Sequence, residues 1–447
     1  MARAKVIIVG ALGMDFHVFN TCFKGKNNYE IVAFTIAGEQ NVGTVEGSGR
    51  KFPAELAGEE LYPNGIPMVP ESQLEDIVKK HHVDEVIFAY SDISHEEVMH
   101  IASRSIASGA NFRLMSGSNT MIKANKPVVA VCAVRTGCGK SQVSRAVYRF
   151  LKEKGIKVVA IREPMPYGNL IKQNVMRFEN YEDLDKYDCT IEEREEYEPY
   201  IEQGLVIYSG IDYGKIIEEA EKEADVIIFD GGNNEISFYK PDLLFVVVDP
   251  LRPNHEKKYH PGEVNARTAH AFVVNKLNSA NQEDVDTVLA NLKELNPNAK
   301  IIRTNSIVTL ENDGDLKGKR VVVCEDGPTL THGDMAYGAG YIAAKENDAI
   351  IVDPRANLIG TMKTVFEEFP HIAEIIPTMG YDSKQIKDLE ETINSIDADL
   401  VIDGSPFDLG KLINCNKPII RVSYDIEAIG SPTIEELLEK FLTDHLS

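Results

Sequence analysis

The sequence predicts an α/β protein, and three observations support this prediction. Short runs rich in β-branched residues alternate with amphipathic stretches along almost the whole chain, as they do where helices cover a parallel sheet. The chain has 447 residues, which at about 150 residues per domain indicates about three domains. A polar, basic stretch interrupts the pattern before Pro127, where a new apolar strand begins. The first domain boundary is therefore placed at Asn125.

Residues 1–125 are expected to form a Rossmann-like N-terminal domain. The predicted strands are 5–9, 31–35, 85–89 and 111–115, and the predicted helices are 74–81 and 95–108. The turn from Gly10 to Gly13 is only superficially like a dinucleotide-binding turn, because Phe16 stands where a third glycine is required. No acidic residue closes the second strand, so NAD is not supported. The turn either covers a phosphorylated small molecule or is a simple turn.

The segment VVAVCAVRTGCGKSQVSRAV passes from an apolar strand through a glycine turn into a helix. Gly137 and Gly139 let the backbone amides around Cys138 converge on a phosphate group. Lys140 can reach the β and γ oxygens of a nucleotide, and the Ser141 hydroxyl can bind magnesium. This context is typical of a phosphate-binding loop.

The beginning of this loop departs from the Walker pattern GxxxxGK[ST]. Val134 stands at the first glycine of the pattern, and Arg135 follows it, where it can add positive charge to the nucleotide site. A simple strand-to-helix turn would explain the glycines but not the GKS sequence at the first helical turn. The residues expected to bind the nucleotide here are Gly137, Cys138, Gly139, Lys140, Ser141 and Gln142.

Residues 126–318 are expected to form a P-loop NTPase core with a mostly parallel sheet. Its predicted strands are 128–133, 157–161, 225–229, 243–248, 271–274 and 300–302. Further strands are predicted at 320–324, 349–352, 400–402 and 418–422. Residues 319–447 therefore form either a C-terminal α/β extension of the core or a third lobe, and the sequence leaves both open.

The segment ADVIIFDGGNNE places Asp230 at the end of an apolar run, where a Walker B aspartate would hold magnesium. An aspartate that only caps the strand is the alternative. Gly231 and Gly232 would allow the following loop to sense the γ-phosphate. The predicted catalytic residues are Lys140, Asp230 and Arg135, and the predicted magnesium ligands are Ser141 and Asp230.

The segment AFVVNKLN ends an apolar strand with Asn275 and Lys276. In the NKxD motif of GTPases an aspartate reads guanine, but Asn278 stands at that position here. The nucleotide is therefore expected to be ATP, bound with the help of Asn275 and Lys276. The alternative is that these two residues only support the phosphate loop.

Three polar segments indicate a second, anionic ligand. They are AIREPMPYG after the second strand of the core, DPLRPNHEKKYHPGE, and the hydroxyl-rich CEDGPTLTHGD, which has the composition of an anion-binding turn. Solvated loops and ordinary turns are the alternatives. The predicted substrate-binding residues are Arg162, Arg252, His255, Thr329, Thr331, His332 and Gly333.

Composition excludes several classes of partner. Forty-seven basic residues against seventy acidic ones give a net charge of −23 without a basic stripe, which disfavours nucleic acid and anionic membranes but allows a small anionic metabolite. No apolar run approaches the roughly 18 residues that span a bilayer, and the N-terminus lacks a signal sequence. The six cysteines form no CxxC pair, which indicates reduced thiols. We expect a cytoplasmic protein, and a homodimer is left open.

Six segments together resemble one known family: PVVAVCAVRTGCGKSQVSR, REPMPYG, DCTIEEREEYEPYI, DGGNNE, VVDPLRPNHEKKYHPGE and EDGPTLTHGDMAYGAGY. They are similar, over nearly the whole chain, to the archaeal and bacterial predicted P-loop GTPases related to cyclic 2,3-diphosphoglycerate synthetase. The resemblance implies an ATP- and magnesium-dependent ligase. In that reaction the γ-phosphoryl group activates one phosphate of 2,3-diphosphoglycerate, and the neighbouring phosphate displaces it.

A second interpretation belongs to another class of protein. It is a nucleotide-switched GTPase or metallochaperone-like regulator, whose product is a conformational change. Such a switch should keep a base-reading aspartate and would not need the polar cluster between Thr329 and Gly333. The preferred interpretation is therefore an ATP-dependent synthetase that acts on a small phosphorylated acid.

Overall fold

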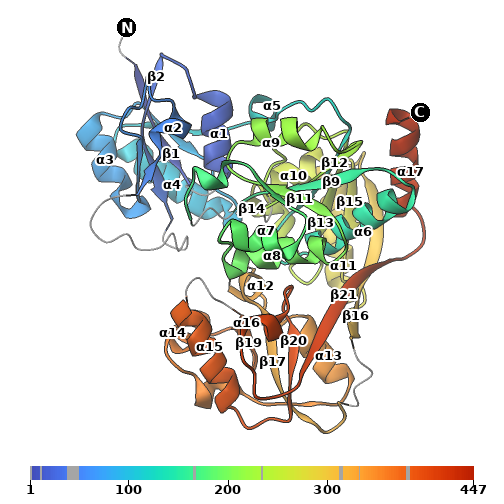
Figure 1. The fold of residues 1–447 in the computed structure, drawn as a ribbon. Helices are drawn as coiled ribbons and strands as arrows, with labels where there is room; N and C mark the ends of the chain where they lie inside the picture. The colour runs from blue at the N-terminus through green and yellow to red at the C-terminus, as the bar shows by residue number, and fades with distance from the viewer. Residues whose placement is uncertain are drawn as a thin grey trace.

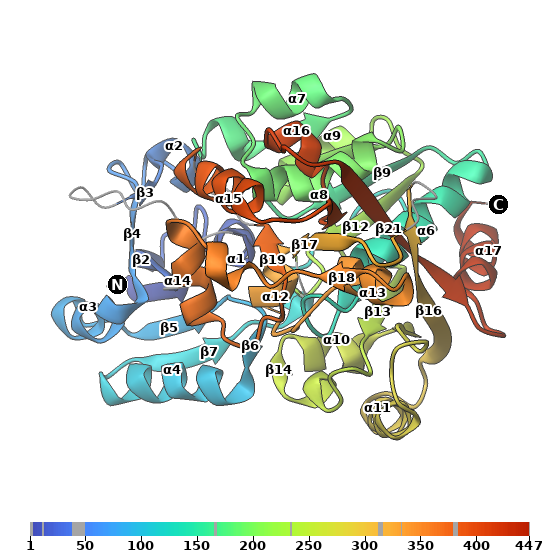
Figure 2. The same cartoon turned by 90° about the horizontal axis from the view of Figure 1, so that it is seen from below.

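The computed structural model describes residues 3–10, 13–37, 50–164, 168–232, 235–311, 316–331, 333–378 and 383–446. It confirms the α/β class, because helices cover the faces of two large and mostly parallel sheets (Figures 1 and 2). The smaller sheet lies in the N-terminal part of the chain. The larger one extends from the phosphate-loop core into the C-terminal lobe.

The N-terminal sheet has the strand order β3-β4-β2-β1-β5-β7. Strand β1 runs parallel to both of its neighbours and is fully buried over its last four residues, which explains its uninterrupted apolar run. All four predicted strands and both predicted helices of this part are confirmed. The elements are β1 (Ala4–Val9), α1 (Met14–Cys22), β2 (Tyr29–Ile36), β3 (Lys51–Phe52), α2 (Ala54–Ala57), β4 (Ile66–Pro70), α3 (Leu74–His81), β5 (Glu85–Phe88), β6 (Ile93–Ser94), α4 (His95–Ala107), β7 (Asn111–Leu114) and α5 (Gly117–Thr120).

The core part of the large sheet has the order β10-β11-β9-β12-β8-β13-β15-β16, with β8 in the middle and buried at all six residues. The sequence did not predict β10 and β11, because runs of three and four residues are too short to show a period. The elements are β8 (Val128–Ala133), α6 (Lys140–Glu153), β9 (Val158–Arg162), β10 (Met176–Phe178), α7 (Tyr181–Lys186), α8 (Ile191–Ile201), β11 (Val206–Ser209), α9 (Tyr213–Ala220), β12 (Val226–Gly231), β13 (Leu243–Val248), β14 (Tyr259–His260), α10 (Gly262–Thr268), β15 (Ala271–Val274) and α11 (Gln282–Leu295).

A long strand joins the core to the C-terminal lobe. Strand β16 (Lys300–Leu310) pairs with the core through its first half and with β21 (Ile419–Ala428), antiparallel, through its second half. From β21 the sheet continues to β20 (Leu400–Gly404), β17 (Arg320–Asp326) and β18 (Ile350–Ile351), and β19 (Ile376–Thr378) pairs with β17. A continuous sheet is what an extension of the core would produce, and the boundaries at residues 125 and 318 stay predictions.

Both faces of the lobe's sheet are covered. Val321 and Val323 of β17 point into one apolar cluster, whereas Val322 and Cys324 point into another. This alternation explains why β17 is apolar at consecutive positions, unlike a strand with one wet face. The covering helices are α12 (Gly327–Thr331), α13 (Ala339–Glu346), α14 (Thr361–Glu368), α15 (Ser383–Ser395) and α16 (Leu409–Leu412).

The last helix, α17 (Ile434–His445), returns to the core and packs against α6 (Figure 1). Its buried residues Ile434, Leu438 and Phe441 are spaced by four and three, so they share one helix face and belong to the main core cluster. Thr433 begins the helix with a capping box that includes Glu436. The helix therefore ties the end of the chain to the nucleotide-binding part.

The N-terminal domain and the core are joined by backbone hydrogen bonds. Strand β6 pairs antiparallel with β14, and His95 N donates to Lys258 O at 2.8 Å just beside this pair. The described parts of the chain contain no helix that is both apolar enough and long enough to cross a bilayer. All six cysteines are free thiols, as their spacing predicted.

Leu438→Ala tests the docking of α17. Leu438 is fully buried, so we expect the substitution to lower the free energy of unfolding by about 2–5 kcal/mol in a denaturant titration. Leu446→Ala is the matched control, because Leu446 is 38% exposed and its truncation should change stability by about 0.5 kcal/mol or less. Equal losses in the two variants would contradict the packing of this helix.

Candidate nucleotide and substrate site

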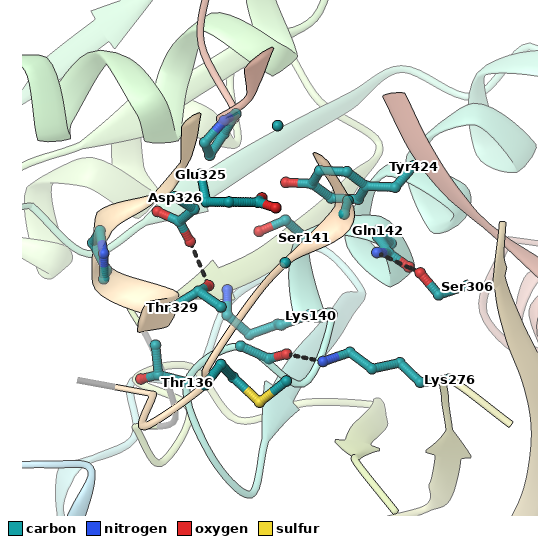
Figure 3. A pocket seen from close by; sticks show the side chains of 18 of the residues that line it. Thr136, Lys140, Ser141, Gln142, Lys276, Ser306, Glu325, Asp326, Thr329 and Tyr424 are labelled. Atoms are coloured by element: carbon teal, nitrogen blue, oxygen red, sulfur yellow. Dashed lines mark hydrogen bonds between the residues drawn. The ribbon is translucent and has the colours of Figure 1, made fainter. Parts of the chain in front are cut away.

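A pocket of about 1390 Å³, open solvent at its mouth included, lies between the phosphate loop and the C-terminal lobe. One side is formed by the loop and the start of α6, where Lys140 and Ser141 point into the space (Figure 3). The other side is formed by the end of β17, the N-terminus of α13 and Tyr424 of β21. Parallel strands of the core and of the lobe therefore present their carboxyl ends to one cavity, which is where α/β proteins bind ligands.

The phosphate loop has the predicted strand–turn–helix form. Gly137 and Gly139 have φ angles of +78° and +99°, in the region that favours glycine. A Cβ at Gly139 would overlap with the side-chain amide of Asn275, so the loop needs glycine there for space as well. Helix α6 begins at Lys140, and its N-terminal amides face the pocket side of the loop.

Asp230, at the end of β12, is a fully buried carboxylate that gathers groups from several elements. Lys140 Nζ lies 3.0 Å from its Oδ1, and Arg162 donates to its Oδ2 at 2.7 Å. The Tyr200 hydroxyl also donates to Oδ2 at 2.7 Å, and the Ser144 hydroxyl donates to Oδ1. The structure thus brings the predicted catalytic pair, Lys140 and Asp230, into direct contact.

Burial and the neighbouring charges shift the pKa values of Asp230 and Lys140. Burial tends to raise the pKa of Asp230, but attraction from Lys140 and Arg162 outweighs it and holds the pKa below its ordinary value. Burial, followed by repulsion from Arg162, lowers the pKa of Lys140. Arg162 is also paired with Glu196 of α8, so Asp230 shares that guanidinium with a second carboxylate. The lysine is therefore held by an ion pair at the position where a phosphate group would enter.

Asn275 and Lys276 donate hydrogen bonds to backbone carbonyl groups of the phosphate loop. Lys276 Nζ donates to Gly137 O at 2.6 Å and lies 2.9 Å from Asp249. The Asn275 amide donates to Cys138 O at 3.3 Å. These contacts are those of loop support, the alternative that the sequence left open, although Lys276 also lines the pocket.

Asn278 has a backbone partner of its own. Its amide donates to Ser306 O at 2.9 Å and accepts from Ser306 N at 3.0 Å, which fixes β16 against the core. A carboxylate could not donate in this pair, so the amide has a structural reason to stand where GTPases carry aspartate. The choice of ATP over GTP stays a prediction at this point.

Arg135 connects all three parts of the molecule. Its guanidinium lies 2.6 Å from Asp92 of the N-terminal domain and 3.1 Å from Asp334 of the lobe, and a nitrogen lies 2.7 Å from His255 Nδ1. It also stacks on the Tyr259 ring, 3.6 Å from the centroid, and is 2% exposed. Arg135 reaches the edge of the pocket, but its contacts are interdomain ones, and its catalytic role stays a prediction.

Some of the predicted substrate residues line the pocket, and others bond to the protein itself instead. Arg162 and Thr329 line the pocket. Arg252 lies behind the phosphate loop instead, where it donates to Gly333 O at 2.6 Å and pairs with Asp249 at 3.1 Å. Thr331, also buried, donates to a backbone carbonyl of its own helix at 3.0 Å. His255 bonds to Arg135, and His332 lies outside the described residues.

Three acids line the pocket and are called here the acidic wall: Glu196, Glu325 and Asp326. Glu325 and Asp326 (Figure 3) belong to the hydroxyl-rich segment expected to bind the anionic ligand but were not among the predicted site residues, and Glu196 was not predicted at all. Burial raises the pKa of Glu325 to about 8 and that of Asp326 to about 6. Glu325 accepts a hydrogen bond from Tyr341 N at 2.8 Å. In the sequence, Glu325 and Asp326 could have been found as a Glu-Asp pair at the end of an apolar strand. Glu196 lies in an acidic helix, where nothing in the sequence distinguishes it from its neighbours.

Comparison with known proteins gives one extensive sequence match. The chain is 56% identical over 440 residues to "Arginine synthetase ArcE" of Thermococcus kodakarensis, covering 98% of this chain and 97% of that protein. No protein-family model matches the chain.

Two solved structures show distant likeness. LpxK from Aquifex aeolicus in complex with ATP is 12% identical, with a TM-score of 0.43 over 73% of this chain and 90% of its own. The hydrogenase maturation factor HypB from Archaeoglobus fulgidus is 17% identical, with a TM-score of 0.24 over 40% of this chain and 80% of its own. Both likenesses are too distant to indicate a function.

Lys140→Ala tests the phosphate loop. The side chain lies in the pocket and Arg162 still pairs with Asp230 without it, so the protein should fold while nucleotide turnover falls by about a hundredfold or more. The matched control is Lys222→Ala, which removes an exposed lysine that pairs only with its helix neighbour Glu219 among the described contacts. Turnover of the Lys140 variant within tenfold of the parent would refute the assignment.

Glu325→Gln tests the buried acid of the wall. Folded Glu325 keeps its proton up to a pH of about 8, whereas its ordinary pKa is 4.5. Between these values the folded state holds more protons than the unfolded state, so the free energy of unfolding falls as the pH rises. The variant lacks this loss and should gain stability relative to the parent from pH 5 to pH 8, measured as Tm. Parallel curves, as expected for the exposed control Glu60→Gln, would contradict the shifted pKa.

Proposed function

The chain belongs to the family of the arginine synthetase ArcE, and from this premise we propose that it forms arginine, or a closely related guanidino compound, at the expense of ATP. Family membership makes the protein an ATP-dependent synthetase, as the sequence predicted. The relative's name gives no support to closure of 2,3-diphosphoglycerate. The expected substrate therefore changes from a phosphorylated acid to a basic amino acid, and the switch interpretation gains no support.

One observation supports this substrate class most directly: basic side chains line one side of the pocket and carboxyl groups line the other. Lys140, Arg145 and Arg162 lie toward the phosphate loop, whereas Glu325 and Asp326 lie on the lobe side. A guanidinium group is a planar cation whose N–H donors match carboxylate oxygens in pairs. Near neutral pH a phosphorylated acid would be repelled by Asp326, whereas a guanidinium group bound there would favour the ionised form of Glu325 as well. The acidic wall thus suits the guanidino end of arginine, and the basic side suits the phosphates of ATP.

The chemistry of such a synthetase follows from the bonds that must change. Arginine differs from a ureido amino acid by one nitrogen in place of one oxygen. The ureido oxygen attacks the γ-phosphorus, forming an O–P bond as the bond to ADP breaks. A nitrogen nucleophile then attacks the ureido carbon, and phosphate leaves with the oxygen. Lys140 is placed to stabilise the transferring phosphoryl group, and a carboxylate must take the proton that the nucleophile loses.

Magnesium fits this arrangement in a limited way. The Ser141 hydroxyl lines the pocket at the start of α6 and offers an oxygen ligand, as in other phosphate loops. Asp230 offers oxygen too, but its two oxygens already accept from four groups. Among the described residues, no group of three or more acidic, histidine or cysteine side chains is arranged so that it could hold a metal ion. Bound with the nucleotide, the ion would neutralise phosphate charge, and Ser141 is the ligand of first choice.

Arginine formation tests the proposal directly. The protein is incubated with ATP, magnesium, the ureido counterpart of arginine and ammonium chloride, and arginine, ADP and phosphate are measured by chromatography. We expect arginine and ADP in equal amounts, with ATP preferred over GTP. ADP formation without any arginine would refute the proposed reaction.

Asp326→Asn tests the acidic wall within this reaction. The variant removes one negative charge from the wall, so the KM for the amino acid should rise about tenfold or more, equivalent to about 1.4 kcal/mol. The KM for ATP should stay within threefold, because the Asp326 carboxylate accepts a hydrogen bond from Thr329 of the lobe and is itself no part of the phosphate loop. Glu60→Gln, on the exposed surface, is the control. Equal rises in both KM values would show that Asp326 does not contact the amino acid selectively.

A further inference from the structure

A second group of acids lies on the other side of Asp230, at the seam between the core and the N-terminal domain. Glu163 directly follows β9, and Glu235 lies in the segment after β12. Ser91 of the N-terminal domain donates to Glu235 Oε1 at 2.5 Å. Asp15, in the first turn of α1, is 1% exposed and accepts from Gly13 N at 2.7 Å. Carboxyl ends of strands from both domains therefore meet at these residues, a second place where α/β proteins bind ligands.

Two glycines make room for the carboxyl groups at this seam. A Cβ at Gly232 would overlap with the carboxyl groups of both Glu163 and Glu235, so these two groups lie next to each other. A Cβ at Gly13 would overlap with the Glu163 carboxyl as well. The backbone of Glu163 is fixed by a hydrogen bond of 3.0 Å from its N to Gly231 O. The close approach of the two acids is thus built into the backbone.

The carboxyl groups of the seam cannot all be ionised at once unless a positive charge lies among them. Burial raises the pKa of Glu163 well above its ordinary value, and Glu235 and Asp15 raise it further. Neighbouring carboxylates in a poorly solvated place need either a shared proton or a cation between them. Within the acidic wall, Glu196 differs from the acids of the seam, because it is paired with Arg162.

Buried polar atoms without partners supply a second, independent observation. The Tyr213 hydroxyl has no hydrogen-bond partner among the described residues, although the side chain is 1% exposed. Glu163 and Glu235 both act electrostatically on this hydroxyl, so it lies near the pair. Glu235 is 6% exposed, and among the described residues its Oε2 has no donor other than the Glu163 carboxyl, which can bond to it only through a shared proton. Buried polar atoms left unsatisfied in this way indicate a missing ligand or water.

We propose that the seam formed by Asp15, Glu163, Tyr213 and Glu235 binds a small cation of the ammonium class, and that this cation supplies the nitrogen nucleophile of the proposed reaction. The second half of this statement rests on the proposed function. At neutral pH an amine is mostly protonated and cannot attack. Transfer of one proton from the ammonium nitrogen to the Glu163–Glu235 pair breaks an N–H bond, forms an O–H bond and frees the lone pair. A carboxylate of raised pKa is the better acceptor.

The position of the seam suits this role. Gly231 and Gly232 join Asp230 directly to the segment that carries Glu235, and Arg162, which contacts Asp230, is followed by Glu163. Glu163 therefore directly adjoins a residue that lines the pocket, and Glu235 follows Asp230 by five positions. A nucleophile released there would emerge beside Arg162, which lines the pocket, and the N-terminal domain would shield it from water.

The test measures cation binding without turnover. The Tm of the full chain is followed during titration with ammonium chloride and, separately, with potassium chloride at constant ionic strength. Potassium is of similar size but donates no hydrogen bond. We expect half-saturation at an ammonium concentration about tenfold or more below that of potassium, and we expect Glu235→Gln and Glu163→Gln to lose this difference. Glu60→Gln is the matched control and should behave as the parent.

Each result decides the inference. Equal responses to both salts in the parent, or a parental ammonium response in both glutamine variants, would overturn it. Stabilisation of each variant by ATP shows that the variant is folded and its nucleotide site intact. If ammonium binds as expected but no arginine forms, the site stands and the proposed function fails. If arginine forms but ammonium and potassium act alike, the proposed function stands and the seam is not the ammonium site.

Discussion

The buried carboxylate of Asp230 is the constraint on which the site depends. It lies at the carboxyl end of a central strand and pairs with Lys140 of the phosphate loop and Arg162 of the neighbouring strand. It also accepts a hydrogen bond from the Tyr200 hydroxyl of α8. Removal of this charge would leave the buried Lys140 without its carboxylate partner, whereas Arg162 would keep Glu196. An unpaired buried charge is far more costly than loss of a surface pair. The carboxylate therefore fixes the loop, the strand and the helix relative to each other before any ligand is bound.

The placement of the other two parts follows from the direction of the strands. Because parallel strands end at the same edge, the polar residues after β8, β9 and β12 form one surface, against which both the N-terminal domain and the C-terminal lobe pack. Arg135 binds to acids of both neighbours from the middle of this surface. The lobe supplies Glu325 and Asp326 of the acidic wall, and the N-terminal domain closes the seam. The phosphate loop thus has the acids of the lobe on one side and the acids of the seam on the other.

This arrangement explains how a loop typical of nucleotide binding can serve the synthesis of a cation. Phosphate groups require the basic side, and a guanidino product requires acids that are kept apart from those bases. The lobe achieves the separation, because Glu325 and Asp326 stand on β17, which is connected to the core sheet through β20, β21 and β16. Burial also keeps both acids partly protonated near neutral pH, which weakens their attraction to the bases across the pocket.

The sequence by itself determined the α/β class, most of the longer strands and the phosphate loop, because each depends on residues that are close along the chain. An apolar run, two glycines and GKS within a few positions specify a strand, a turn and a helix start without distant partners. Tertiary structure decided the rest of the site. Glu196, Glu325 and Asp326 meet only after the lobe packs on the core, and Arg252 and Asn278, polar residues of the kind that bind ligands, are engaged by Asp249 and Ser306 instead. Whether a polar side chain faces a ligand or a neighbour depends on burial and pairing, which spacing along the chain does not encode.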